Sequence, residues 1–122
     1  THSYISKNSI IGKNCLVLEN QTIQKNVKIG DNVFLWSGNH IGHHSVIEDH
    51  CYIASQVVVS GNCRIGEASF VGVNATLHDG VTVGAGSVIA AGALIKRDVE
   101  PGSVMTAASA RLSDRKASEV DL

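Results

Sequence analysis

The sequence predicts an all-β protein, a parallel β-helix, and three features of its 122 residues support that prediction. Every sixth residue from Ile5 to Ile95 is Ile, Val or Leu, without one insertion. The residue two positions earlier is usually small, and residues two apart in a strand lie on the same face. Gly or Asn often follows three positions later, where a tight corner with positive φ favours them. Each hexad is therefore a short strand followed by a corner.

Corners that all turn the same way exclude hairpins, so the hexads must coil and each strand must pair with the next coil. Three hexads close one triangular coil, and residues 5–95 supply about five coils stacked roughly 4.8 Å apart. We expect this β-helix over residues 1–98. The period fails at Lys96 and Pro101-Gly102 follows, so residues 99–122 are expected to form a capping strand and tail. The strand is expected within 103–110, followed by a short helix opening at Ser113 or a loose tail.

Composition excludes several classes of function. Lys plus Arg total 10 and Asp plus Glu total 11, a balance that argues against nucleic acid or an anionic membrane surface as the main partner. No run of about 18 apolar residues is present to span a bilayer. The chain opens without a basic-then-apolar leader, so we expect a cytoplasmic protein. Only 4% of residues are aromatic, which indicates a narrow core of small aliphatic side chains.

The three cysteines fall on the inward small-residue phase of the hexads. Cys15 and Cys51 share a face but lie two coils apart, roughly 9–10 Å, which is too far for a disulfide. Cys63 belongs to another face. We expect buried, reduced thiols that fill space, as in a reducing compartment.

One outward face is predicted to be apolar. Stacking of every third hexad aligns Leu16, Phe34, Tyr52, Phe70 and Val88, with Leu18, Trp36 and Ala54 on the adjoining corner. A second face, with Lys28, Val46, Arg64 and Thr82, is expected to be solvated. An apolar ladder on a polar surface is typical of an interface, so we expect a homo-oligomer. A cover supplied by another domain or by the C-terminal tail is the alternative.

Four of the six histidines cluster within residues 40–50. His44 and His50 occupy the phase in which Asn recurs. Two interpretations of each are open: it forms a corner at positive φ, or it has a chemical role. His43 occupies a corner phase that elsewhere carries exposed charged residues, and it is a candidate general base. Gly61 lies three hexads later, which places it one coil above His43. A base beside a backbone N–H donor is the arrangement that acyl transfer needs.

The stretch 43–53, followed by Gly61-Asn62 and 70–75, resembles the bacterial sugar acetyltransferases related to sialic acid O-acetyltransferases and UDP-4-amino-sugar N-acetyltransferases. The resemblance covers about residues 1–108. It implies a left-handed helix, a homotrimer, and acetyl-CoA bound in the groove between neighbouring coils. It also implies His43 as the general base and Gly61 as the amide that meets the acetyl carbonyl. Three departures stand out: His44 replaces a frequent acidic residue, Tyr52 replaces a frequent second His, and the small nucleotide-binding N-terminal domain that commonly precedes the helix is not in this sequence. Residues 106–110 also lack the usual Gly-x-Pro-Ala close.

The resemblance implies direct acetyl transfer from acetyl-CoA to an amino or hydroxyl group of a sugar, nucleotide-linked or a surface-polysaccharide precursor, without a covalent acyl-enzyme and without a metal. The candidate substrate and CoA contacts are His44, His50, Tyr52, Trp36, Lys25, Lys96 and Arg97. Lys25 is the candidate for an anionic sugar nucleotide. Lys96 and Arg97, near the C-terminal end of the helix, are candidates for the CoA phosphates, although solvated charge is the alternative for each.

Two other classes of function stay open. A γ-carbonic-anhydrase-like zinc enzyme uses three His across a trimer interface, and the His cluster invites the comparison, but that family's ligand spacing does not map onto this sequence. A non-catalytic β-helix scaffold, or an ice-binding face, is the other class. The latter needs a regular Thr ladder, which Thr22, Thr76 and Thr82 do not make. The acceptor, and the choice between N- and O-acetylation, are not determined by the sequence.

Overall fold

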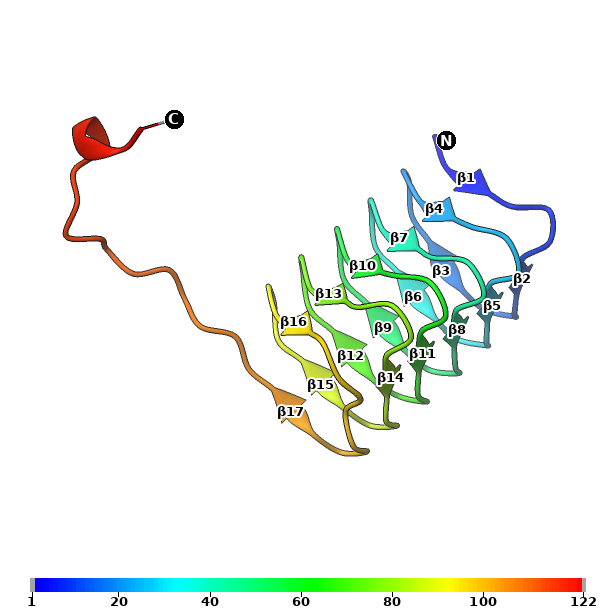
Figure 1. The fold of residues 1–122 in the computed structure, drawn as a ribbon. Coiled ribbons are helices and arrows are strands. Elements are labelled where there is room, and N and C mark those ends of the chain that lie inside the picture. The colour runs from blue at the N-terminus through cyan, green and yellow to red at the C-terminus, as the bar shows by residue number, and fades with distance from the viewer. Residues whose placement is uncertain (1, 122) are drawn as a thin grey trace.

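A computed structural model describes residues 2–121, and within them seventeen two-residue strands wind into a three-sided left-handed parallel β-helix (Figure 1). The predicted fold class is confirmed. The strands are β1 (Tyr4–Ile5), β2 (Ile10–Ile11), β3 (Leu16–Val17), β4 (Thr22–Ile23), β5 (Lys28–Ile29), β6 (Phe34–Leu35), β7 (His40–Ile41), β8 (Val46–Ile47), β9 (Tyr52–Ile53), β10 (Val58–Val59), β11 (Arg64–Ile65), β12 (Phe70–Val71), β13 (Thr76–Leu77), β14 (Thr82–Val83), β15 (Val88–Ile89), β16 (Leu94–Ile95) and β17 (Val104–Met105).

Every third strand pairs in parallel, which makes three sheets. The first sheet is β1-β4-β7-β10-β13-β16, the second is β2-β5-β8-β11-β14, and the third is β3-β6-β9-β12-β15-β17. His40 pairs with Val58, and Val58 pairs with Thr76, so the predicted coil of three hexads is confirmed. A site residue can therefore be placed by its corner and by its coil.

The corners and the core follow the hexad pattern. Non-glycine residues adopt positive φ at Asn14, Asn20, Asn26, Asn32, His44, His50, Gln56, Asn62, Ala68 and Asn74. His44 and His50 thus form corners at positive φ, which was one of the two interpretations given for each of them. The aliphatic residue of each hexad points inward, and Ile23, Leu35 and Ile41 are fully buried. The core is a narrow aliphatic column, as the low aromatic content predicted.

The cysteines are unpaired, as expected. Cys51 and Cys63 are buried and Cys15 is half-buried. Burial raises the pKa of the Cys51 thiol to about 11, and burial also raises the pKa of Cys63. The Cys51 and Cys63 thiols fill space in the core, and their raised pKa values keep them protonated and unreactive.

The helix continues beyond the point where the hexad period ends. β17 pairs with β15 through Val88 and Val104, and Val83 bridges to Val99, so both pairings close a coil that is shorter than the regular one. The last coil has lost two residues, at the corner formed by 96–98. With sheets of six, five and six strands, the described residues make nearly six coils instead of the expected five, because a shortened coil still closes the triangle.

Beyond β17 the chain leaves the prism (Figure 1). The helix expected to open at Ser113 is not formed, and the only helical turn in residues 106–121 is a 3-10 turn at Ala117–Glu119. The Ser113 hydroxyl accepts a hydrogen bond from the Arg115 N–H at 3.1 Å. No residue of that turn is buried, so no apolar packing supports a longer helix. No helix of residues 2–121 has the length and hydropathy to cross a bilayer.

The predicted apolar ladder covers the third sheet. Leu16, Phe34, Phe70 and Val88 are exposed, Tyr52 is half-buried, and Val104 extends the ladder by one coil. The Tyr52 ring lies between those of Phe34 and Phe70, with centroids 5.7 and 5.3 Å away. Ala54, which we expected in this outward patch, is buried, because a methyl group does not project past the neighbouring coils.

Candidate functional site

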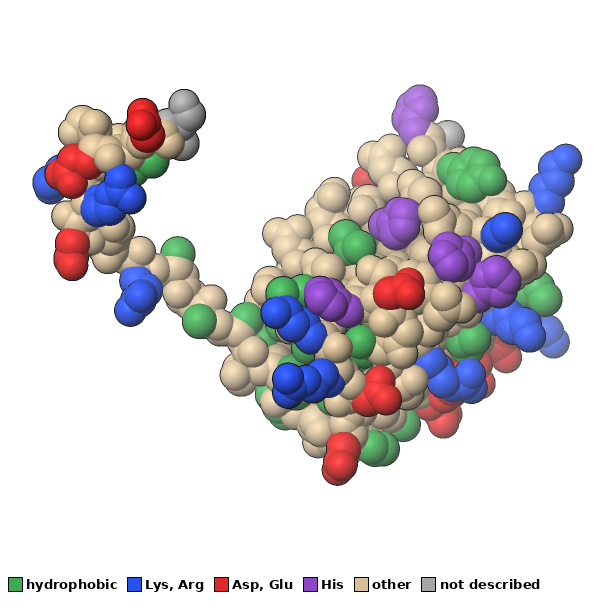
Figure 2. Space-filling model, viewed as in Figure 1, with side chains coloured by type: hydrophobic (Ala, Val, Ile, Leu, Met, Phe, Trp, Pro, Cys, Tyr) green, Lys and Arg blue, Asp and Glu red, His purple; other side chains and the backbone are tan. Residues whose placement is uncertain are grey.

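His43 lies on the corner between β7 and β8, where the chain passes from the first sheet to the second. Its backbone N–H donates to Gln24 Oε1 in the coil below at 2.9 Å, which holds the corner in place. Its side chain is half-buried and borders a hollow of about 290 Å³ shared with Tyr4, Gln24 and Lys25. Figure 2 shows histidine side chains around β7 and the corner that leads from it toward the second sheet. The base predicted from the sequence therefore borders an open hollow.

Gly61 lies directly against the imidazole of His43. A Cβ built on Gly61 would stand 2.6 Å from His43 Nε2 and 2.7 Å from Cε1. The absence of a side chain is what allows the ring to lie there, and Gly61 is buried beneath it. The Gly61 N–H makes no hydrogen bond within residues 2–121. That a ligand can approach the Gly61 amide stays a prediction. Sequence reasoning missed a different role of this glycine, which is to make room for the ring.

Asp79 approaches the same point from the other side. Its Oδ1 would be 3.0 Å from a Cβ on Gly61, so this carboxylate and His43 Nε2 face one small space. Asp79 is exposed and lies one coil above Gly61 in the same corner. We did not predict Asp79 from the sequence, although the stack of hexads that connects His43 to Gly61 continues to Asp79.

The other nitrogen of His43 faces its neighbour in sequence. His43 Nδ1 lies 3.1 Å from His44 Nδ1, and the two rings meet edge to face. His44 Nε2 in turn lies 3.1 Å from Nδ2 of Asn26, one coil below. His44 adopts φ 61°, which turns its ring back toward His43 along the corner. Three side chains thus form one hydrogen-bonded row that ends at the candidate base.

The other candidate contacts divide into those on the same edge of the prism as His43 and those away from it. Lys25 lines the same hollow as His43. Lys96 and Arg97 lie on the same edge of the prism, three coils or roughly 14 Å further along, and line a separate hollow of about 460 Å³. The remaining three lie away from this edge within the single chain. His50 is on the corner between β8 and β9, Tyr52 is on the third sheet, and Trp36 is on the corner after β6, with its ring centroid 6.2 Å from that of Tyr52.

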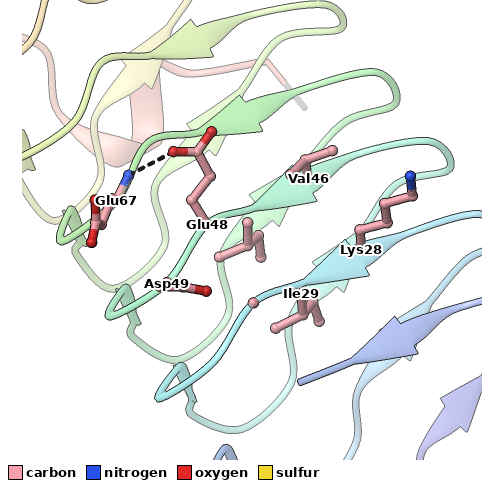
Figure 3. Close-up of a pocket in the computed structure, with 8 residues that line it drawn as sticks. Lys28, Ile29, Val46, Glu48, Asp49 and Glu67 are labelled. Carbon is pink, nitrogen blue, oxygen red and sulfur yellow. Dashed lines mark hydrogen bonds between the residues drawn. The ribbon is translucent and has the colours of Figure 1, made fainter. Parts of the chain in front are cut away.

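A further hollow, of about 320 Å³, lies on the outer face of the second sheet (Figure 3). Glu48 points toward Glu67 and accepts a hydrogen bond from its N–H at 3.2 Å, and Glu48 also pairs with Arg64 at 2.5 Å. Asp49 Oδ1 accepts from the Asp31 N–H at 2.7 Å. Glu48 and Asp49 are engaged in hydrogen bonds that hold one coil to the next, so we assign no chemistry to this hollow. Residues 2–121 contain no group of three or more side chains that could hold a metal ion.

Comparison with known proteins finds N-acetyltransferases among the proteins similar to this chain. A 2,3,4,5-tetrahydropyridine-2,6-dicarboxylate N-acetyltransferase of Staphylococcus aureus is 42% identical over 50 residues, which are 41% of this chain and 20% of that enzyme. PerB from Caulobacter crescentus, solved with CoA and GDP-perosamine, has a TM-score of 0.81 at 25% identity, over 84% of this chain and 49% of that one. A mutant of perosamine N-acetyltransferase from the same organism has a TM-score of 0.82 at 24% identity, over the same shares.

The chain thus spans about half the length of these solved structures and a fifth of the curated relative. The model of the bacterial transferase hexapeptide family, with six repeats, matches residues 26–61 and again 62–97. These two matches cover more than half of the chain, and they fall on the coils that carry His43, Gly61 and Asp79. The chain therefore belongs to the bacterial transferase hexapeptide family.

Proposed function

We propose that this chain carries the active centre of an acetyl-CoA-dependent acetyltransferase that acts on an amine of a sugar, with His43 as general base. The observation that carries the proposal is the contact between the His43 ring and Gly61 at an open corner, in a chain of the hexapeptide transferase family. A base and a backbone N–H without a partner in residues 2–121 lie together there. They are the two groups that attack on a thioester requires.

The reaction follows from these two groups. The amine nitrogen attacks the thioester carbonyl carbon of acetyl-CoA, so a C–N bond forms and the C–S bond breaks. His43 Nε2 takes the proton that the amine loses and passes it to the departing sulfur. The Gly61 N–H donates to the carbonyl oxygen as negative charge develops there. A general base typically contributes about 10²–10⁴-fold, and one oxyanion donor about 3–4 kcal/mol.

An amine is favoured over a hydroxyl by two observations. The relatives of this chain include, by name, two N-acetyltransferases. The Asp79 carboxylate faces the same space as His43 Nε2, and a carboxylate attracts an amino group, which gains a proton readily, more strongly than it attracts a neutral hydroxyl. PerB was solved with a sugar nucleotide, and Lys25 supplies a positive charge at the His43 hollow for such a phosphate-bearing acceptor.

The assembly belongs to the proposal as well. The apolar ladder of the third sheet leaves Phe34, Phe70 and Val88 exposed, which supports association of copies of this chain as a homotrimer. Acetyl-CoA then lies along the His43 edge, with Lys96 and Arg97 as partners for its phosphates. The reduced cysteines support a cytoplasmic location.

The test is a transfer assay with acetyl-CoA and a panel of amino-sugar nucleotides and their hydroxyl counterparts, followed by release of free thiol. We expect turnover on an amine, and a loss of at least 10²-fold in kcat/KM for His43→Ala. His2→Ala removes an exposed histidine in the segment before β1; it is the matched control and keeps full activity. Light scattering verifies that the variants assemble alike. Full turnover by a correctly assembled His43→Ala variant refutes the proposal.

A further inference from the structure

We infer that Asn26 and His44 act as positioning residues that decide which nitrogen of His43 carries its proton. The catalytic consequence rests on the proposed function, but the hydrogen-bonded row does not. The row consists of Asn26 Nδ2 to His44 Nε2 at 3.1 Å and His44 Nδ1 to His43 Nδ1 at 3.1 Å. Both distances are those of ordinary hydrogen bonds.

The backbone holds the row in place. Asn26 and His44 adopt φ 59° and 61°, so they occupy equivalent positions in consecutive corners. The His44 N–H donates to the Lys25 carbonyl at 3.1 Å, which fixes one corner above the other. The His43 N–H is held by Gln24. The side chains of Asn26 and His44 therefore meet because the coil places their backbones in register.

Proton positions along this row are coupled. Two neutral imidazoles that meet through their Nδ1 atoms need one donor and one acceptor. For His43 Nε2 to accept a proton from the acceptor amine, the proton of His43 must reside on Nδ1, where it is donated to His44 Nδ1. His44 then carries its own proton on Nε2 and requires an acceptor. The side chain within reach is Asn26, whose amide offers one acceptor, Oδ1.

The side-chain amide of Asn26 can therefore take two orientations, and each one places the proton of His43 on a different nitrogen. With Nδ2 toward His44, as the structure orients it, the row runs in the opposite direction and leaves the proton of His43 on Nε2, where that atom cannot act as a base. A half-turn of the amide exchanges nitrogen and oxygen without moving any other atom. The form with Oδ1 toward His44 is the one that prepares His43 for catalysis. Where a catalytic His is paired with a carboxylate, the carboxylate does the same work, and its replacement by an amide costs about 10⁴-fold.

Variants at Asn26 separate this role from a structural one. Asn26→Asp offers only acceptors to His44, so we expect kcat at or above that of the original protein. Asn26→Gly removes the amide while tolerating positive φ, and we expect kcat and kcat/KM to fall together by about 10-fold, with the KM for acetyl-CoA unchanged. The matched control is Asn32→Gly, which breaks the equivalent 3.2 Å contact of Asn32 with His50 at the next corner. It carries the same backbone change and keeps full kcat.

Variants at His44 test the middle of the row. His44→Asn puts its side-chain oxygen where Nδ1 was and suits the left-handed backbone, so it retains most activity. His44→Leu removes every acceptor and loses about 10–10²-fold.

Nitrogen-15 NMR of the imidazoles gives a readout that does not depend on activity. At a pH where imidazoles are neutral, and with the His43 signals assigned by their absence in His43→Ala, we expect the Nδ1–H form of His43 to dominate in Asn26→Asp. The same form declines in Asn26→Gly and not in Asn32→Gly. An unchanged His43 tautomer in Asn26→Gly, or equal losses of kcat in the two glycine variants, overturns the inference. Full activity of His43→Ala overturns the proposed function instead, and leaves the NMR test of the row intact.

Discussion

Replacing Gly61 by Ala tests the link between backbone geometry and catalysis most directly. The added Cβ would stand 2.6 Å from His43 Nε2, whereas ordinary contacts begin at 3.4 Å, so the ring must retreat by about 0.8 Å. The φ of Gly61 is outside the left-handed region, so the backbone accepts alanine without strain. The perturbation is therefore confined to the ends of His43 and Asp79, which face the new methyl group.

The expected magnitude follows from that displacement. A misplacement of about 1 Å can cost about 10²-fold, so we expect kcat/KM to fall by about 30- to 100-fold, or roughly 2–3 kcal/mol of transition-state stabilisation. The free energy of unfolding should change little. A compatible Gly→Ala change stabilises by about 0.4–1 kcal/mol, and crowding against a half-buried ring offsets this.

The assay compares Gly61→Ala with Gly86→Ala by thiol release and thermal unfolding. Gly86 has φ 68° and nothing near the position of its Cβ, so alanine there is strained but touches no side chain. We expect Gly86→Ala to lower the unfolding free energy by about 1–2 kcal/mol and to keep its kcat/KM. Gly61→Ala should thus lose activity and keep its stability, whereas Gly86→Ala should lose stability and keep its activity. Wild-type kcat/KM in a folded Gly61→Ala protein would refute the role given to the imidazole's position.

Three further predictions concern charge, assembly and pH. Asp79→Asn should lower kcat/KM for the amine acceptor by about 10-fold and barely change it for acetyl-CoA, and equal losses for both substrates would contradict an amine contact. Phe70→Asp puts a charge on the exposed apolar ladder, so light scattering should detect monomers, and an intact trimer would exclude this face as the interface. Burial raises the pKa of Cys51 to about 11 from an ordinary 9.0, so the unfolded chain releases this proton first. Stability should be full below pH 9, and this group should lower it by on the order of 2 kcal/mol as pH rises to 11. Urea unfolding should show a smaller fall in Cys51→Ala, because Cys63, whose pKa burial also raises, still contributes.

The contacts around His43 show where sequence reasoning stopped. The coil of three hexads aligns Asn26 with His44, and it aligns Gly61 and Asp79 with His43, so the neighbourhood was present in the sequence. The repeat pattern could not predict which side-chain atoms of these residues are in contact. Those contacts depend on χ angles and on the corner that turns His44 back toward His43. The buried position of Gly61 beneath the ring also depends on a side-chain direction.

The C-terminal coil shows a second limit. The strand expected within 103–110 exists as Val104–Met105, but the loss of two residues at 96–98 removes the period by which a sequence pattern is recognised. Backbone pairing tolerates this loss, because Val99 and Val104 need only meet their partners, Val83 and Val88. The helix at Ser113 was a local expectation, and nothing in the tertiary structure of residues 2–121 supports it.

The sequence by itself determined the winding of this protein, the inward aliphatic column and the corner on which His43 lies, since a strict period of six repeats one local choice of strand and turn sixteen times. Tertiary structure decided the chemistry of that corner. The row from Asn26 to His43 and the space shared with Asp79 arise only when coils stack, because hydrogen bonds and steric contacts act between atoms a full coil apart in the chain but one strand spacing apart in space.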